Sequence, residues 1–111
     1  MPSIKLETSV VLSKDEESAL ALEIANFAAV QLNKPLEVVQ VRIQSGITVS
    51  FGDNLNAGSA FLHIALIGKI APDTKSAFPE KFAAILEKYG VDRSRLFLHY
   101  TETDANAWGW L

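Results

Sequence analysis

The sequence of 111 residues predicts an α/β fold in which two βαβ units share one four-stranded mixed sheet, with two helices on one face. Three observations support this prediction: a capping box before a long amphipathic helix, an apolar run with a single polar residue that is typical of a central strand, and a strand–helix–strand order that occurs twice. Short connections favour parallel pairing and right-handed crossovers within each unit.

The first unit reads as a strand at about 2–8, a helix at about 14–32 and a strand at about 38–44. Ser13 and Glu16 form the capping box, in which each side chain satisfies a free backbone N–H. Apolar residues then recur at helical spacing and predict one buried stripe: Leu20, Ile24, Phe27, Ala28 and Leu32.

Four further residues define the surroundings of this helix. Asn33 and Pro35 are typical of its end. Leu22 and Val30 fall outside the apolar stripe, so we expect part of the far side of the helix to contact a neighbour.

The second unit reads as a strand at about 60–67, a helix at about 74–89 and a strand at about 95–100. Apart from His63, the first of these strands is apolar on both faces, which predicts that both are covered. Because the two helices cover only one face of the sheet, we expect another copy of the protein to cover the other.

The second helix has a less regular pattern. Asp73 or Thr74 is a suitable cap, and Gly90 suits the end of the helix. Pro79 removes a helical hydrogen bond, so we expect a distorted first turn or a regular helix that begins only near Pro79. The predicted buried residues are Phe78, Phe82, Ile85 and Leu86.

Length and composition limit the function classes. The length fits a single domain over residues 1–111. A net charge of −3 gives no electrostatic case for a nucleic-acid or membrane partner, and the absence of cysteine excludes disulfides and thiolate metal sites. Without an apolar span or a signal peptide, we expect a cytoplasmic protein, although unconventional secretion leaves no mark on a sequence.

Pro2 is the first candidate for chemistry. Removal of the initiator methionine before this small residue leaves a secondary amine, and an ordinary terminal amine has a pKa of about 7.7–8.0. Burial in an apolar pocket lowers such a pKa and favours the neutral base. The alternative is that Pro2 simply opens a strand, where its missing N–H costs nothing.

Two further positions are candidates for anion binding. Lys34 either complements the dipole of the preceding helix or binds a substrate carboxylate. Gly68 either supplies a turn or lets a ligand approach the backbone, so that the Ile67 N–H binds an anionic oxygen.

The remaining polar and aromatic candidates have weaker patterns. His63 is expected to be a partly buried, hydrogen-bonded histidine, whereas His99 faces either a pocket or solvent. Without carboxylates beside them, the two histidines predict no metal site. Trp108 and Trp110 either pack at the chain end or help it pair with a neighbouring subunit's sheet edge. The sequence has no Gly-rich phosphate loop and no nucleophile elbow.

Taken in order and spacing, several short motifs resemble the macrophage migration inhibitory factor family of the tautomerase superfamily over nearly the whole chain. They are Met1-Pro2, Asn33-Lys34-Pro35, Phe51-Gly52, Ile67-Gly68-Lys69-Ile70 and Trp108-Gly109-Trp110. The resemblance implies a homotrimer with active sites at the subunit interfaces.

The resemblance also implies a reaction, the keto–enol tautomerisation of an α-keto acid such as phenylpyruvate or of a dopachrome-like compound. Pro2 is then the catalytic base, and Lys34 with the Ile67 N–H binds the substrate carboxylate. The family needs no metal or organic cofactor for this reaction, so the expected partners are the substrate and two further copies of the chain.

Four positions depart from the animal members of the family. Phe97 replaces a tyrosine, His99 an asparagine, Val38 an aromatic pocket residue, and Trp108 a smaller residue. We therefore expect tautomerase activity that is weaker than in animal relatives, with His99 replacing the lost hydroxyl donor from an adjacent subunit.

Two alternatives stay open. One is a cytokine-like signalling protein with a vestigial site. Ser59 and Leu62 replace the family's Cys-x-x-Cys pair, which rules out its redox chemistry, and Leu12 and Gly46 replace two charged residues linked to receptor binding. The other is dehalogenation or decarboxylation, which needs an arginine and an acidic partner around the proline, and no arginine here fits that pattern.

Overall fold

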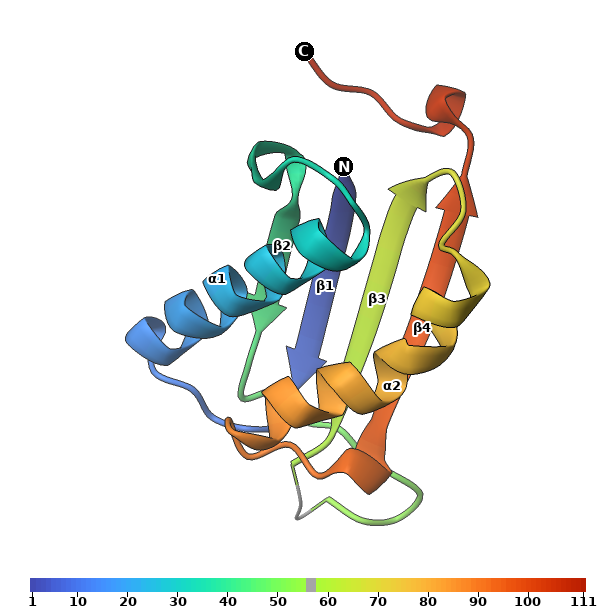
Figure 1. The fold of residues 1–111 in the computed structure, drawn as a ribbon. Coiled ribbons are helices and arrows are strands. Elements are labelled where there is room, and N and C mark those ends of the chain that lie inside the picture. The colour runs from blue at the N-terminus through green and yellow to red at the C-terminus, as the bar shows by residue number, and fades with distance from the viewer. Residues whose placement is uncertain (56–57) are drawn as a thin grey trace.

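Two helices lie side by side on one face of a four-stranded sheet with the strand order β2-β1-β3-β4 (Figure 1). The computed structural model describes residues 1–55 and 58–111. The main elements are β1 (Pro2–Thr8), α1 (Lys14–Gln31), β2 (Gln40–Gln44), β3 (Ala60–Ile67), α2 (Pro72–Glu87) and β4 (Leu96–Thr103). The predicted α/β class is confirmed.

Strand pairing follows the two-unit prediction. β1 pairs with β2 in parallel, and β3 pairs with β4 in parallel, whereas β1 and β3 are antiparallel and join the two units. In this register Pro2 lies opposite Leu66, so the first residue of β1 lies beside the C-terminal end of β3. The sheet thus brings the start of the chain to the end of β3 where Gly68 follows.

Element boundaries differ from the prediction at two strands. β2 begins at Gln40 instead of residue 38, because Leu36–Val38 form a short 3₁₀ turn first. β4 continues to Thr103, three residues beyond the predicted end, because it pairs along the full length of β3. This extension adds Thr103 to the strand end near Pro2.

α1 begins and ends as its sequence indicates. The Glu16 N–H donates to the Ser13 hydroxyl at 3.1 Å, and the Ser13 N–H donates to the Glu16 carboxylate at 2.9 Å. Asn33 ends the helical path with a left-handed φ of 53°. Leu22 is 66% exposed and Val30 is exposed as well, as expected for positions outside the apolar stripe.

α2 differs from the prediction at its start. It begins at Pro72 after Ala71, which makes no side-chain cap, so neither Asp73 nor Thr74 is the cap. The helix then runs continuously through Pro79, and both predicted consequences of this proline are wrong. Pro79 has no N–H for the Lys75 carbonyl four residues earlier, and the Tyr100 hydroxyl donates to that carbonyl instead, at 3.5 Å.

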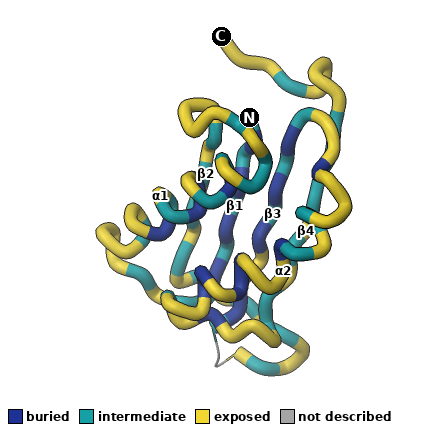
Figure 2. Tube along the Cα trace, viewed as in Figure 1, coloured by how far each residue is buried: buried dark blue, intermediate teal, exposed yellow. Residues whose placement is uncertain are grey.

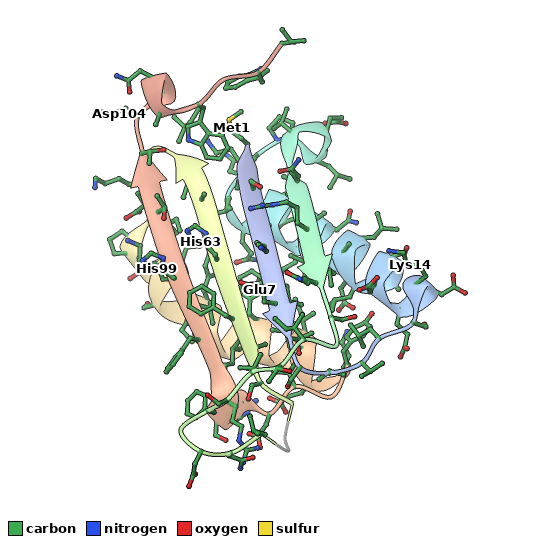
Figure 3. All side chains as sticks on the ribbon, turned by 180° about the vertical axis from the view of Figure 1, so that it is seen from behind. Met1, Glu7, Lys14, His63, His99 and Asp104 are labelled. Atoms are coloured by element: carbon green, nitrogen blue, oxygen red, sulfur yellow. The ribbon has the colours of Figure 1, made fainter. Side chains whose placement is uncertain are left out.

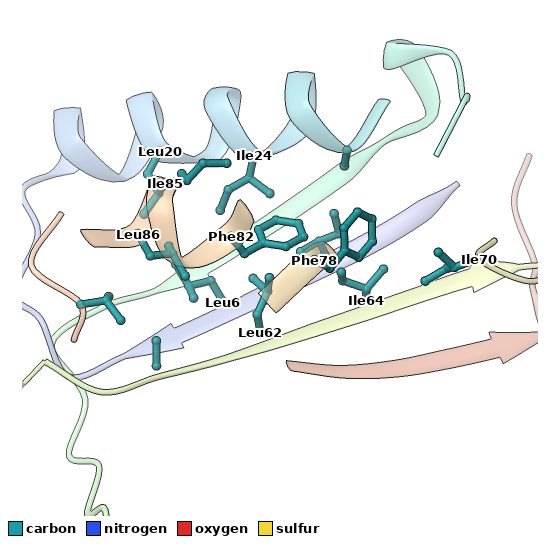
Figure 4. Close-up of a cluster of buried hydrophobic side chains, with 14 of the residues drawn as sticks. Leu6, Leu20, Ile24, Leu62, Ile64, Ile70, Phe78, Phe82, Ile85 and Leu86 are labelled. Atoms are coloured by element: carbon teal, nitrogen blue, oxygen red, sulfur yellow. The ribbon is translucent and has the colours of Figure 1, made fainter. Parts of the chain in front are cut away.

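The hydrophobic core fills the layer between the helices and the sheet (Figure 4). Phe78 and Phe82 of α2 are fully buried and pack edge to face at 5.2 Å, against Leu20 and Ile24 of α1. Aromatic rings in this arrangement stabilise a core beyond the apolar area they bury. This core fixes both helix ends that border the candidate site.

The opposite face of the sheet, which we call the open face, has no helix over it in the single chain (Figure 2). The apolar outer side of β3 indicated a covered surface, but Phe61 is 40% exposed there. The same face carries polar and charged side chains on other strands, including Lys5 of β1, next to β3, and Arg42 of β2, one strand further away. The open face is therefore a mixed surface and not a uniformly apolar one.

Within residues 1–55 and 58–111, neither helix has a stretch that is long and apolar enough to cross a membrane.

Candidate active site

Pro2 lies fully buried at the start of β1 and lines a small cavity. The cavity has a volume of about 200 Å³ and opens between the chain start, the turn before β2 and the C-terminal segment. Its lining residues are Met1, Pro2, Ser3, Val38, Gln40, Trp108, Gly109 and Trp110. Two of the predicted binding residues, Val38 and Trp108, thus join Pro2.

Lys34 and Ile67 line a second cavity on the helix side of the same sheet end. This cavity of about 230 Å³ lies between the end of α1, the end of β3 and the start of α2, and Lys69 also borders it. Burial, and then the charge of Lys34, lower the pKa of the Met1 amine below its ordinary value of 8.0. The Lys34 charge therefore acts at the chain start, although it borders a different cavity from Pro2.

Trp108 is held in place by a chain of hydrogen bonds to the end of β3. Its indole N–H donates to the Thr103 hydroxyl at 2.7 Å, and that hydroxyl donates to the Leu66 carbonyl at 2.9 Å. The Thr103 carbonyl in turn accepts the Gly68 N–H at 2.8 Å. Thr103 thus connects Trp108, which lines the Pro2 cavity, to Leu66, which lies opposite Pro2.

Glu102 fixes the loop between β3 and α2. One of its carboxylate oxygens accepts the Ile70 N–H at 2.7 Å, and the other accepts the Lys75 ammonium at 2.8 Å. The bond from Lys75, followed by the bond from Ile70, lowers the pKa of Glu102 below its ordinary value of 4.5. Only the ionised carboxylate makes both contacts well, so the loop depends on the charge of Glu102.

We expect the two contacts of Glu102, with the Ile70 N–H and the Lys75 ammonium, to weaken in acid. A carboxyl group whose pKa is lower in the folded protein stabilises the folded state fully at pH values above its unfolded pKa, which is near 4.5. That stabilisation is lost as the pH falls through the folded pKa. Wild type should therefore be more stable than Glu102→Gln at neutral pH, and the difference should shrink in acid. Urea unfolding of both proteins across this pH range measures it, and a difference independent of pH would contradict the assignment.

Phe97 and His99 lie on the open face of β4 and do not reach Pro2 within one chain. Phe97 pairs with Phe61 near the N-terminal end of β3, which is the opposite end of that strand from Leu66. His99 pairs with His63 in the middle of the strand. Phe97 is 59% exposed and contacts the Phe51 ring at 5.2 Å. A role for either residue at Pro2 requires a second copy of the chain.

Several residues of this site were missed from the sequence. Gln40 and Ser3 line the Pro2 cavity and are hydrogen-bonded to each other at 2.7 Å. Both residues are polar and pair with each other on neighbouring strands. Neither strand's sequence by itself determines how β1 and β2 align, so their pairing could not be predicted. In the described part of the chain, no three histidine or acidic side chains gather into a possible metal site.

The sequence model of the macrophage migration inhibitory factor family matches residues 1–111. The chain belongs to this family. Four of the five motifs that suggested the family meet around Pro2 and the end of β3, whereas Phe51 contacts Phe97 at the other end of the strand. Comparison with curated protein sequences found no match.

Solved structures of macrophage migration inhibitory factors from several organisms share the fold. The homologue from Prochlorococcus marinus is 24% identical with a TM-score of 0.89, covering 98% of this chain and 95% of that one. The protein from Toxoplasma gondii is 24% identical with a TM-score of 0.88, covering 97% and 95%. That from Trichinella spiralis is 24% identical with a TM-score of 0.84, again covering 97% and 95%.

Proposed function

We propose that the protein is a keto–enol tautomerase that acts on phenylpyruvate-like α-keto acids with Pro2 as the catalytic base. The observation that carries the proposal is the place of Pro2, which is buried and lines a cavity together with Val38 and two tryptophans. Removal of Met1, which lines the same cavity, exposes the proline nitrogen there as a secondary amine.

The chemistry follows from this amine. In its neutral form the Pro2 nitrogen takes a proton from the carbon beside the substrate carbonyl, which leaves an enolate. A proton is then returned to the enolate oxygen, so that the product is the enol, Pro2 is neutral again and no atom is gained or lost. The two causes that lower the pKa of the Met1 amine, burial and the Lys34 charge, act at the same place and favour a neutral amine. General acid–base catalysis of this kind contributes about 10²–10⁴ in rate.

Lys34 and the Ile67 N–H are the proposed carboxylate binders. Both border one cavity at the end of β3, and Lys34 makes no side-chain ion pair within the described residues. An unpaired ammonium is free to meet a substrate carboxylate as a point charge. Electrostatic stabilisation of the developing enolate is the contribution expected of these groups.

A homotrimer is the proposed assembly, with each site completed by a neighbouring copy. The aromatic end of the open face, formed by Phe51, Phe61 and Phe97, leaves Phe97 59% exposed. At the other end of the molecule Trp110 is 67% exposed beside the Pro2 cavity. Contact between copies would cover such rings and bring Phe97 and His99 toward another chain's Pro2. Light scattering should give three times the chain mass of 12.1 kDa.

Phenylpyruvate tautomerisation tests the proposal directly. One protein begins at Pro2, as confirmed by mass spectrometry, and its matched control carries one alanine inserted between Met1 and Pro2. We expect turnover by the first, and a loss of about 10²–10⁴ for the second because its proline nitrogen is an amide. Equal rates for the two proteins would disprove a role for the terminal amine.

The same pair of proteins separates this function from the signalling alternative. If neither protein turns over the substrate while both bind a receptor equally, the pocket altered at Val38, Phe97 and Trp108 is vestigial. The departures at these positions support a tautomerase weaker than its animal relatives.

A further inference from the structure

Thr103, the last residue of β4, contacts the end of β3 on both sides of Ile67. Its hydroxyl donates to the Leu66 carbonyl at 2.9 Å, and its own carbonyl accepts the Gly68 N–H at 2.8 Å. One threonine thus holds the residue before Ile67 through its side chain and the residue after Ile67 through its backbone. The backbone around Ile67 is therefore fixed relative to β4.

The bond to the Leu66 carbonyl also sets the direction of the Ile67 N–H. This carbonyl and this N–H belong to one planar trans peptide group, so they point in opposite directions. Because the carbonyl points toward β4, the N–H points toward β1, where Pro2 pairs with Leu66. Figure 3 shows Met1 and Asp104, which border β1 and β4, at this same end of the sheet. The N–H that the proposed function assigns to the substrate carboxylate is therefore directed to the Pro2 side of β3.

The Trp108 indole begins the same series of hydrogen bonds. Its N–H donates to the Thr103 hydroxyl at 2.7 Å, and this hydroxyl donates its own hydrogen to the Leu66 carbonyl. Every donor in the series points the same way, from Trp108 through Thr103 to the peptide group that ends in the Ile67 N–H. Hydrogen bonds in such a series polarise one another, so the two inner bonds make the Ile67 N–H a stronger donor.

We infer that Thr103 is a positioning residue of the carboxylate site, which acts through the peptide group between Leu66 and Ile67 and does not touch the substrate. The inference rests on the proposed function, because that function supplies the carboxylate for the Ile67 N–H. Leu66 and Ile67 line one of the two cavities, and Trp108 lines the other together with Pro2. The Thr103 hydroxyl therefore couples the proposed carboxylate donor to a wall of the cavity that contains the base.

Binding of 3-phenylpropanoate to the whole protein tests this role without turnover, because this acid has no ketone to enolise. The protein begins at Pro2, and an NMR titration gives the dissociation constant. Thr103→Val keeps the shape of the side chain and removes the hydroxyl. We expect it to weaken binding about three- to tenfold, which corresponds to the net contribution of one hydrogen bond. The uncharged 3-phenylpropanamide should lose less, because a neutral acceptor gains less from a strong donor.

The same spectra report on the peptide group directly. Loss of the hydrogen bond at the Leu66 carbonyl leaves the Ile67 N–H less polarised, so its proton resonance should move to lower frequency in Thr103→Val. Thr103→Ser keeps the hydroxyl, and we expect it to restore both the resonance and the binding of the acid to near the wild-type values.

Thr8→Val is the matched control at the other end of β1. The Thr8 hydroxyl makes the same pair of contacts, since it donates to the Ser59 carbonyl at 2.8 Å and accepts the Val10 N–H at 3.1 Å. We expect this substitution to lower the free energy of unfolding at least as much as Thr103→Val does. Binding of the acid should be unchanged, because Thr8 is remote from the Pro2 end of the sheet.

Four outcomes would overturn the inference. They are the absence of binding by wild type, an equal loss in Thr103→Ser, an equal loss in Thr8→Val, and equal losses for the acid and the amide in Thr103→Val. The last would show that Thr103 only shapes the cavity wall at Trp108. Failure of the proposed function looks different: a protein that binds the acid through Thr103 but does not turn over phenylpyruvate would contradict the reaction and support the role of Thr103.

Discussion

Leu20→Ala is expected to lower the free energy of unfolding by about 2–5 kcal/mol, the usual cost of truncating a fully buried leucine. Leu20 is completely buried on the inner side of α1, where it packs into the cluster formed with Ile24 and Phe82 (Figure 4). Both helices and the sheet meet around this side chain, so the surrounding residues have little freedom to close the resulting cavity. Urea unfolding followed by circular dichroism measures the change.

Leu22→Ala supplies a matched control on the same helix. The substitution is chemically identical, but Leu22 is 66% exposed, and exposed substitutions usually change stability by no more than about 0.5 kcal/mol. Equal losses for the two variants would contradict the predicted packing of α1. A large loss for Leu22→Ala that depends on protein concentration would instead show that a neighbouring copy covers this side of the helix.

Local patterns were sufficient to predict most of the fold. The capping box at Ser13 and the apolar spacing of α1 placed that helix to within one residue, and the apolar run of β3 gave its bounds without error. Besides the shifted ends of β2 and β4, the errors concern α2, where the effect of a helix-breaking residue was predicted without knowledge of its surroundings. Pro79 is accommodated because Tyr100, from a strand far along the chain, meets the orphaned Lys75 carbonyl.

The candidate site was predictable only in part, for a related reason. Pro2, Val38 and Trp108 carried local or family signals and do line one cavity. Thr103 and Glu102 lie beyond the predicted end of the last strand. Their contacts around the site form only because β4 continues alongside β3 as far as the Gly68 turn.

Lys34→Met is expected to lower kcat/KM for phenylpyruvate by about tenfold to a hundredfold if the proposed reaction is correct. The substitution keeps the apolar stem and removes the ammonium, and a hydrogen bond to a charged group is worth about 1.5–3 kcal/mol. The methyl ester of the same substrate has no carboxylate charge. The loss should therefore be confined to the acid, as steady-state rates on the two substrates will show.

Lys69→Met is the control for this prediction, because Lys69 borders the same cavity from the loop after Gly68 but is more exposed. We expect it to change both rates little.

An equal fall for acid and ester in Lys34→Met would assign that residue the other role its position suggests, complementing the dipole at the end of α1. Because that role concerns stability and not substrate charge, it would also appear as a lower free energy of unfolding. A loss confined to the acid with unchanged stability would instead place the carboxylate at Lys34, and the reacting carbon of the substrate would then have to lie between this residue and the nitrogen of Pro2.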